Sequence, residues 1–109
     1  MSMRSELPKQ DEIIFKLNEI VEHELAGVVR YTHYSFMIFG YNRIPVVSWF
    51  RSAATETLSH ATQAGEMITM LGGHPSLGIG KLLETHKHDM AEILNESMEF
   101  EIQGVELYR

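Results

Sequence analysis

Apolar residues recur at intervals of three and four along most of this chain, which is the spacing of amphipathic α-helices. The pattern is interrupted twice, each time by a cluster of glycine and proline, residues that are typical of helix ends and helix starts. No stretch alternates with the period of two that strands show. We therefore predict an all-α protein with three long helices, over residues 11–39, 46–71 and 89–109.

The connection between the second and third helices is long enough to cross the whole molecule. Residues 72–88 contain four glycines and one proline. Fully extended at ~3.3 Å per residue, about sixteen residues reach roughly 50 Å, whereas a helix of 26 to 29 residues is about 40 Å long. A third helix after such a crossover can run parallel to the second. Residues 1–10 are polar, contain Pro8, and are expected to form a flexible lead-in.

Composition removes several classes of function. The chain has 109 residues, a net charge of −6 and no cysteine. Such acidity does not suit binding to a phosphate backbone, so we expect no nucleic-acid partner. The absence of cysteine excludes a thiolate metal site, and no apolar run is long enough to predict a membrane span. With no apolar signal core at the N-terminus, we expect a cytoplasmic protein. We also note no internal repeat.

Three polar residues interrupt the predicted apolar stripes, one in each helix: Glu24, His60 and Glu101. A lone buried carboxylate costs several kcal/mol unless it is paired or bound to a metal. If the first two helices are antiparallel and the third is parallel to the second, all three residues lie near mid-height. Carboxylates with a neutral imidazole and without thiolate suit iron or manganese. The alternative remains that the glutamates face water and that the histidine is simply hydrogen-bonded.

Five short motifs stand out along the chain: LNE (17–19), ELAGVVRY (24–31), SHA (59–61), LGGHP (71–75) and EFEIQG (99–104). These motifs resemble those of the bacterioferritins, or of a close bacterioferritin-like branch of the ferritin superfamily. The resemblance covers nearly the whole chain after residue 12. It implies a ferritin-like four-helix bundle with a long crossover, of which these residues are expected to cover helices one to three and to lack most or all of helix four.

The resemblance also implies an activity and a set of site residues. Members of that family oxidise Fe(II) at a di-iron centre inside each bundle, with O2 or peroxide as electron acceptor, and store iron in a shell of 24 subunits. Glu24 matches a terminal iron ligand, His60 the histidine of a Glu-x-x-His motif, and Glu101 the carboxylate of the third helix, expected to bridge the two metals. Tyr31 matches a tyrosine beside the site and is our candidate catalytic residue.

Two positions depart from the family pattern. The second-helix glutamate should precede His60 by three residues, and that position holds Thr57. Glu56 is adjacent and shares a helix face with His60, so it is a substitute metal ligand in one interpretation and a residue facing the shell interior in another. Leu58 stands where the family has its haem methionine, so haem binding by that route is doubtful.

The sequence leaves three hypotheses open. The first is a bacterioferritin-like, homo-oligomeric protein that binds iron and oxidises Fe(II). The second is a ferritin-like shell subunit in which Thr57 marks a lost metal position and which has no metal chemistry of its own. The third is a helical interaction subunit. Metal-dependent stabilisation that disappears on replacement of His60 would exclude the third.

Overall fold

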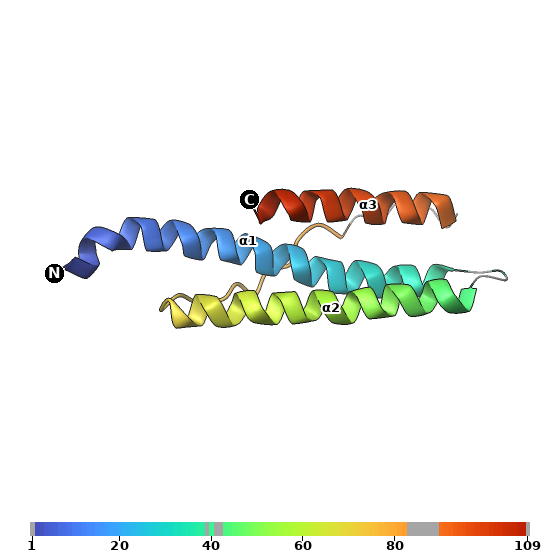
Figure 1. Ribbon diagram of the computed structural model, residues 1–109, viewed down its shortest axis with the longest axis horizontal. Helices are drawn as coiled ribbons and strands as arrows, with labels where there is room; N and C mark the ends of the chain where they lie inside the picture. Colours follow the sequence, from blue (N-terminus) through green and yellow to red (C-terminus); the bar gives the residue numbers. More distant parts are fainter. Residues whose placement is uncertain (1, 39, 41–42, 83–89, 109) are drawn as a thin grey trace.

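Three α-helices account for most of the chain, as the sequence predicts. The computed structural model describes residues 2–38, 40, 43–82 and 90–108, and in these ranges it contains no strand. None of the helices described there carries an apolar stretch long enough to cross a lipid bilayer. The helices are α1 (Ser2–Met37), α2 (Arg43–Met70) and α3 (Met90–Leu107) (Figure 1).

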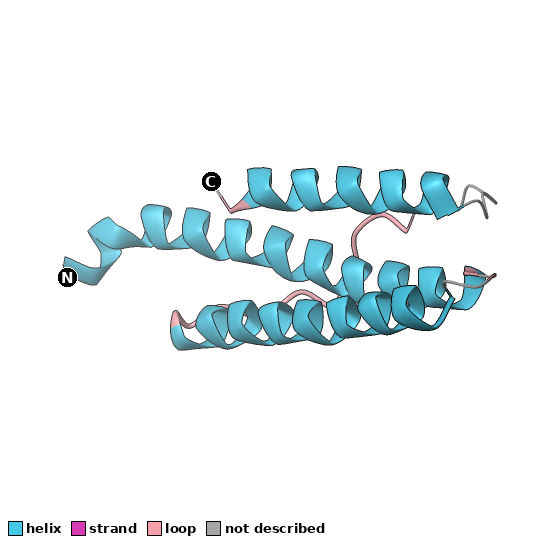
Figure 2. Ribbon diagram, turned by 45° about the vertical axis from the view of Figure 1, so that its right-hand side comes forward, coloured by secondary structure: helices cyan, strands magenta, loops and turns pink. Residues whose placement is uncertain are grey.

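The helices form an elongated and open arrangement of 63 × 21 × 20 Å with α1 in the middle. Helices α2 and α3 both pack on α1, and within the described ranges they do not pack on each other. Both run antiparallel to α1 and therefore parallel to one another, as the length of the crossover predicts (Figures 1 and 2). Two of the four edges of a square bundle are thus in place, α1–α2 and α1–α3, and α2 and α3 do not contact each other in the described ranges.

Two helix starts differ from the sequence prediction. Helix α1 begins at Ser2 rather than near residue 11, so the expected lead-in is helical. Pro8 removes the hydrogen bond to the carbonyl of Arg4, and the ribbon bends near its first turns (Figure 1). Helix α2 begins at Arg43, which places Pro45 in its first turn, where a missing N–H has little cost.

A continuous apolar seam joins α1 to α2. Because residues three and four apart lie on one face of a helix, α2 presents a nearly unbroken row of small and apolar side chains to α1. Phe50 and Ile68 in this row are completely buried. The buried members on α2 are Val47, Phe50, Ala54, Thr57, Ala61, Ala64 and Ile68.

Helix α3 has two apolar faces, and the stripe that Glu101 interrupts, which the sequence analysis expects in the core, is not the face that packs on α1. Ile93 and Phe100 are buried against α1. The expected core stripe lies instead along the open side of the helix, because both faces have the same three-and-four spacing. Its members Leu94, Met98, Val105 and Tyr108 are exposed.

Side-chain and backbone hydrogen bonds fasten the crossover to α1. Gly72, with a φ of 81°, ends α2 in a conformation that favours glycine. Beyond it, the Asn18 side chain accepts a hydrogen bond from the Ser76 backbone N–H at 2.7 Å. The Glu22 carboxylate accepts one from the Ser76 hydroxyl at 2.6 Å, and the Glu22 carbonyl accepts one from the Gly80 N–H at 2.8 Å. The chain is thereby guided across α1 towards α3.

Candidate metal centre

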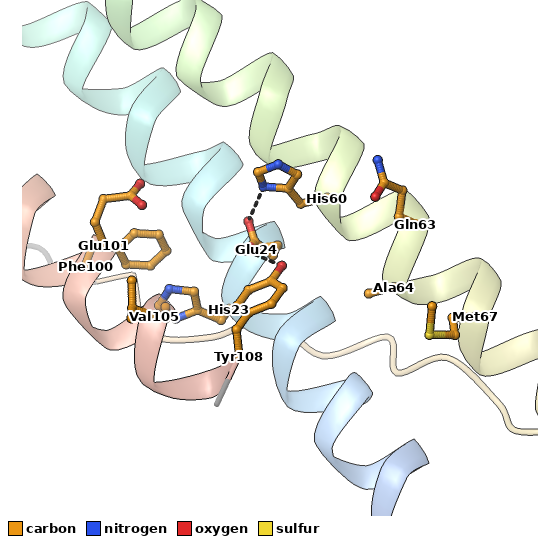
Figure 3. Close-up of a pocket in the computed structure, with 11 residues that line it drawn as sticks. His23, Glu24, His60, Gln63, Ala64, Met67, Phe100, Glu101, Val105 and Tyr108 are labelled. Atoms are coloured by element: carbon orange, nitrogen blue, oxygen red, sulfur yellow. Dashed lines mark hydrogen bonds and ion pairs between the residues drawn. The ribbon is translucent and has the colours of Figure 1, made fainter.

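Glu24, His60 and Glu101 line one cavity of about 510 Å³, although each comes from a different helix (Figure 3). The three polar residues that interrupt the predicted apolar stripes thus lie around a common cavity, and their role as metal ligands stays a prediction. Glu24 of α1 forms the buried floor, with 10% of its side chain exposed. His60 of α2 is at the cavity edge, with 45% exposed. Glu101 of α3 is an exposed residue on the opposite wall.

Glu24 lies between two partners. Its Oε1 accepts a hydrogen bond of 2.8 Å from the Tyr108 hydroxyl, and its Oε2 is 3.7 Å from Nδ1 of His60. Figure 3 shows the imidazole and the phenol on opposite sides of the carboxylate. The carboxylate is therefore oriented by α3 on one side while its other oxygen faces α2.

Tyr31 has the matching role on the other carboxylate. Its hydroxyl donates a hydrogen bond to Oε1 of Glu101. The two bonds are reciprocal, because α1 supplies the tyrosine in one pair and the glutamate in the other. Tyr31 thus contacts Glu101, and its side chain is almost completely buried; its catalytic role stays a prediction.

The two reciprocal hydrogen bonds correspond to a short internal repeat in the sequence, which our sequence analysis did not detect. The segments HELAGVVRY (23–31) and FEIQGVELY (100–108) share glutamate, glycine, valine and tyrosine at the same positions. Glutamate and tyrosine are seven residues apart in both, which is about two helical turns and places them on one face. In an antiparallel pair, each glutamate then meets the tyrosine of the other helix. The helix pair α1–α3 therefore has a local internal two-fold symmetry.

Two stacked rings lie at the centre of this symmetry. His23 and Phe100, the first residues of the two segments, stack with centroids 4.0 Å apart and planes inclined by 8°. A Cβ on Gly27 would come within 2.9 Å of the Phe100 ring, and one on Gly104 within 3.0 Å of Nε2 of His23. The shared glycine therefore admits the ring of the opposite helix in both halves.

The electrostatics of the cavity disfavour an uncompensated negative charge. Burial and the nearby charge of Glu24 raise the pKa of Glu101. Burial, together with the hydrogen bond to Glu24 and its charge, raises the pKa of Tyr108, so this phenol remains a donor. Burial lowers the pKa of His23 and outweighs the opposing effects of Glu24 and of a hydrogen bond to the Phe100 backbone. A bound cation would relieve the repulsion between the two carboxylates.

Two neighbours of His60 on α2, Thr57 and Glu56, line a second cavity together with Glu24, His60 and Glu101. Thr57, one turn earlier, is buried, and its methyl group is 2.8 Å from the position that a Cβ on Gly27 would occupy. Glu56 is 75% exposed, and its carboxylate is 4.0 Å from Nε2 of His60, the nitrogen facing away from Glu24. Leu58 is exposed. It lines neither the cavity of Figure 3 nor the second cavity, which Trp49 lines together with Glu24, His60 and Glu101.

A buried polar network fixes α3 at the level of the site. The guanidinium of Arg30 is 4.4 Å from the centroid of the Phe100 ring and donates a 3.1 Å hydrogen bond to the Tyr34 hydroxyl. Tyr34 in turn donates to Glu96 of α3 at 3.2 Å. Because Glu96 precedes Glu101 by five residues and Phe100 is directly before it on the same helix, this network sets the position of Glu101 along α1.

The donor chemistry suits a hard or borderline cation. Glu24, Glu101 and His60 offer oxygen and nitrogen, which iron, manganese and zinc accept. Within the described ranges, no group of three or more histidine, aspartate or glutamate side chains is arranged to hold a metal ion. The three candidates share a cavity, and the two tyrosines occupy one oxygen on each carboxylate.

Sequence reasoning selected the three polar residues that line the cavity and did not select Tyr108 or His23, which contact Glu24 and Phe100 in the structure. The repeated glutamate–glycine–tyrosine spacing in residues 24–31 and 101–108 was the available signal. Gly27 could be recognised only from the structure, since its role depends on Thr57 and Phe100 approaching it.

Comparison with known proteins agrees with this architecture. A family model described as "Ferritin-like domain" matches residues 14–109. A crystal structure of ferritin-like, diiron-carboxylate proteins from Bacillus anthracis str. Ames is similar, with a TM-score of 0.85 and 25% sequence identity, over 91% of this chain and 70% of that chain. No curated protein matches the chain significantly. On the extent of the family match, this chain belongs to the ferritin-like domain family.

Proposed function

We propose that this protein binds Fe(II) in the cavity between its three helices and promotes its oxidation to Fe(III). The observation that carries the proposal is the convergence of Glu24, His60 and Glu101 on one cavity in a ferritin-like chain. The structurally similar B. anthracis proteins are described as diiron-carboxylate proteins, which supports iron as the metal.

The proposed chemistry follows from the donors. Carboxylates stabilise Fe(III) more than Fe(II), so a site with two of them favours loss of an electron to O2 or peroxide. Glu24 and His60 would hold the Fe(II) substrate, and Glu101 would close on it from α3. Tyr31 and Tyr108 keep each carboxylate oriented by donating to a single oxygen, which leaves the second oxygen available.

Further features of the bacterioferritin hypothesis remain predictions. They comprise a di-iron centre, iron storage, a homo-oligomeric shell of up to 24 subunits and a cytoplasmic location. The internal symmetry of α1 and α3 gives Glu24 and Glu101 the same kind of partner, a tyrosine hydroxyl on the other helix. It therefore offers no support for the expected distinction between a terminal Glu24 and a bridging Glu101.

Fe(II) oxidation in air tests the proposal. The rate is measured at mildly acidic pH, where Fe(II) in buffer alone is oxidised slowly, with the parent protein and with Glu101→Gln. We expect the variant to lose at least roughly tenfold in protein-dependent rate, since even residues around a metal ligand change affinity by that much.

Glu99→Gln is the matched control, because Glu99 is on the same helix, two residues away and exposed. It should retain the parent rate. Equal rates for the parent and Glu101→Gln would overturn the site assignment, and no protein-dependent oxidation at all would favour a ferritin-like subunit without metal chemistry.

A further inference from the structure

The outer face of α2 carries a basic surface around Arg43 and Arg51. Both arginines are exposed, and they line a shallow hollow of about 750 Å³ together with serine and threonine hydroxyls. Glu56 is the acidic residue that also lines this hollow. Among the described residues, neither arginine has an acidic partner within ion-pair distance. On a chain with a net charge of −6, this surface is therefore a local excess of positive charge.

Helix α3 carries charge of the opposite sign. It contains five glutamates and no lysine or arginine. Two of them, Glu96 and Glu101, accept hydrogen bonds from tyrosines of α1. The other three are Glu92, Glu99 and Glu106, which are exposed and seven residues apart. Seven residues are about two helical turns, so these three glutamates form an acidic row along one side of the helix.

An exposed apolar residue lies beside the charges on both helices. Ile44 lines the hollow of the basic surface and is 78% exposed. Ile102 follows Glu99 by three residues on α3 and is 58% exposed. Residues three apart are neighbours on a helix surface. Each surface therefore combines charge with apolar area, which suits a protein partner, whose interfaces contain both, better than a free ion.

The charges on the two helices also have nearly the same spacing. Arg43 and Arg51 are eight residues apart, which corresponds to about 12 Å along α2. Glu92 and Glu99 are seven residues apart, which corresponds to about 10.5 Å along α3. The reach of an arginine side chain exceeds this small difference. Two such helices laid side by side can therefore pair both charges at once.

The two surfaces cannot meet within one chain. Helices α2 and α3 lie on either side of α1, and within the described ranges they do not pack on each other (Figures 1 and 2). Helix α2 turns Phe50, Ala54 and Thr57 towards the interior, and both arginines are on its exposed side. A contact between the basic surface and the acidic row must therefore join two molecules.

We propose that the basic surface of α2 in one copy of this chain binds the acidic row of α3 in a second copy. Every molecule carries both surfaces, and they complement each other in charge, which favours specific association. Because the two surfaces differ, each contact leaves one surface free on either copy, and further copies can add to form a ring or a chain. The inference gives the expected homo-oligomer a specific contact and does not depend on metal binding.

The mass of the full chain in solution tests the proposal, measured by analytical ultracentrifugation over a range of concentrations. We expect the parent to associate reversibly. Arg51→Glu and Glu99→Arg each place like charges opposite one another. Since such a juxtaposition is unfavourable by several kcal/mol, each variant alone should raise the dissociation constant at least about tenfold.

An equimolar mixture of the two variants provides a sharper test. Arg51→Glu keeps the acidic row of the parent, and Glu99→Arg keeps its basic surface, so the mixture contains a complementary pair. We expect it to associate although neither variant does so alone. Glu66→Arg is the matched control, because it reverses the charge of an exposed α2 residue outside the hollow, and it should associate as the parent does. Circular dichroism verifies that each variant is folded.

The results that contradict the proposal are distinct. A parent that stays monomeric at all concentrations would overturn it, also if that monomer bound an acidic peptide such as poly-glutamate, since the basic surface would then serve another partner. Association that persists in both Arg51→Glu and Glu99→Arg would place the contact elsewhere. A mixture of the two folded variants that remains dissociated would refute the pairing of these two surfaces.

Discussion

The two surfaces of α1 are held to their partners by different means. Towards α2, the contact is an apolar seam of small and branched side chains, including the fully buried Phe50 and Ile68. Towards α3, two buried apolar residues are accompanied by a series of hydrogen bonds and ring contacts. The difference indicates that the first seam provides stability, while the second determines where the site carboxylates lie.

The strongest test of this difference removes the largest side chain of the α1–α2 seam. Phe50→Ala should lower the free energy of unfolding by about 3–5 kcal/mol, because it deletes a completely buried ring in contact with Tyr31 and Tyr34. Urea unfolding followed by circular dichroism measures it. Phe36→Ala removes a ring that is 61% exposed and should change the free energy of unfolding little. Equal losses of stability in the two variants would show that burial in the α1–α2 seam does not determine the stability.

Gly27→Ala perturbs both seams at once. The added methyl group would be 2.8 Å from the Thr57 methyl and 2.9 Å from the Phe100 ring, so we expect a loss of about 1–3 kcal/mol from overpacking. Adding Thr57→Ser removes the collision on the α2 side alone and should restore part of the melting temperature. Full restoration would mean that the α3 side accommodates the methyl group freely.

Tyr108→Phe tests the α1–α3 seam by itself. The loss of one hydrogen bond to buried Glu24 should cost about 1 kcal/mol and weaken metal binding roughly tenfold. Trp49 fluorescence during Mn(II) titration reports the affinity. Tyr34→Phe breaks a hydrogen bond in the same seam, to Glu96, which acts on the site only through the position of α3, so it should weaken the affinity less than Tyr108→Phe does. An equal loss of affinity in both variants would assign the effect to helix packing.

The smallest expected effect is a pH dependence at His23. Its pKa is below the ordinary value of 6.5 because it is buried, so the unfolded chain binds a proton more readily than the folded one. Stability is complete above that ordinary value and falls as the pH drops towards the lowered pKa. Unfolding curves at several pH values should therefore converge for the parent and His23→Asn on acidification. A constant difference between them would contradict this assignment.

The sequence specified the helices and the middle of the site for reasons that are local. Glycine at position 72 and proline at position 45 mark helix ends by their own backbone preferences, and Glu24 interrupts an apolar stripe wherever the helix packs. Which face of α3 packs on α1 could not be predicted from the sequence of that helix alone. Ile93 and Phe100 on one side, and Leu94 and Val105 on the other, have equal spacing, and only the docking of the helix distinguishes them.

The roles of Tyr108 and Thr57 depend on contacts with residues of another helix, which are distant in the sequence. Tyr108 acquires its role from Glu24, which is 84 positions earlier. In the sequence, Thr57 stands at the position where the family pattern has a glutamate ligand. The structure adds that its methyl group packs beside Gly27. Such information depends on the register between helices.

The hydrogen bond from Gly80 to the Glu22 carbonyl has a consequence for the order in which the chain assembles. Helices α1 and α2 are joined by a short connection, so they can associate early, whereas α3 must wait for the crossover to close a long loop. Attachment of the crossover to α1 shortens the remaining search for α3. Glu24 and Glu101 therefore meet only when α3 docks, and before that step the chain lacks the cavity that these two glutamates line.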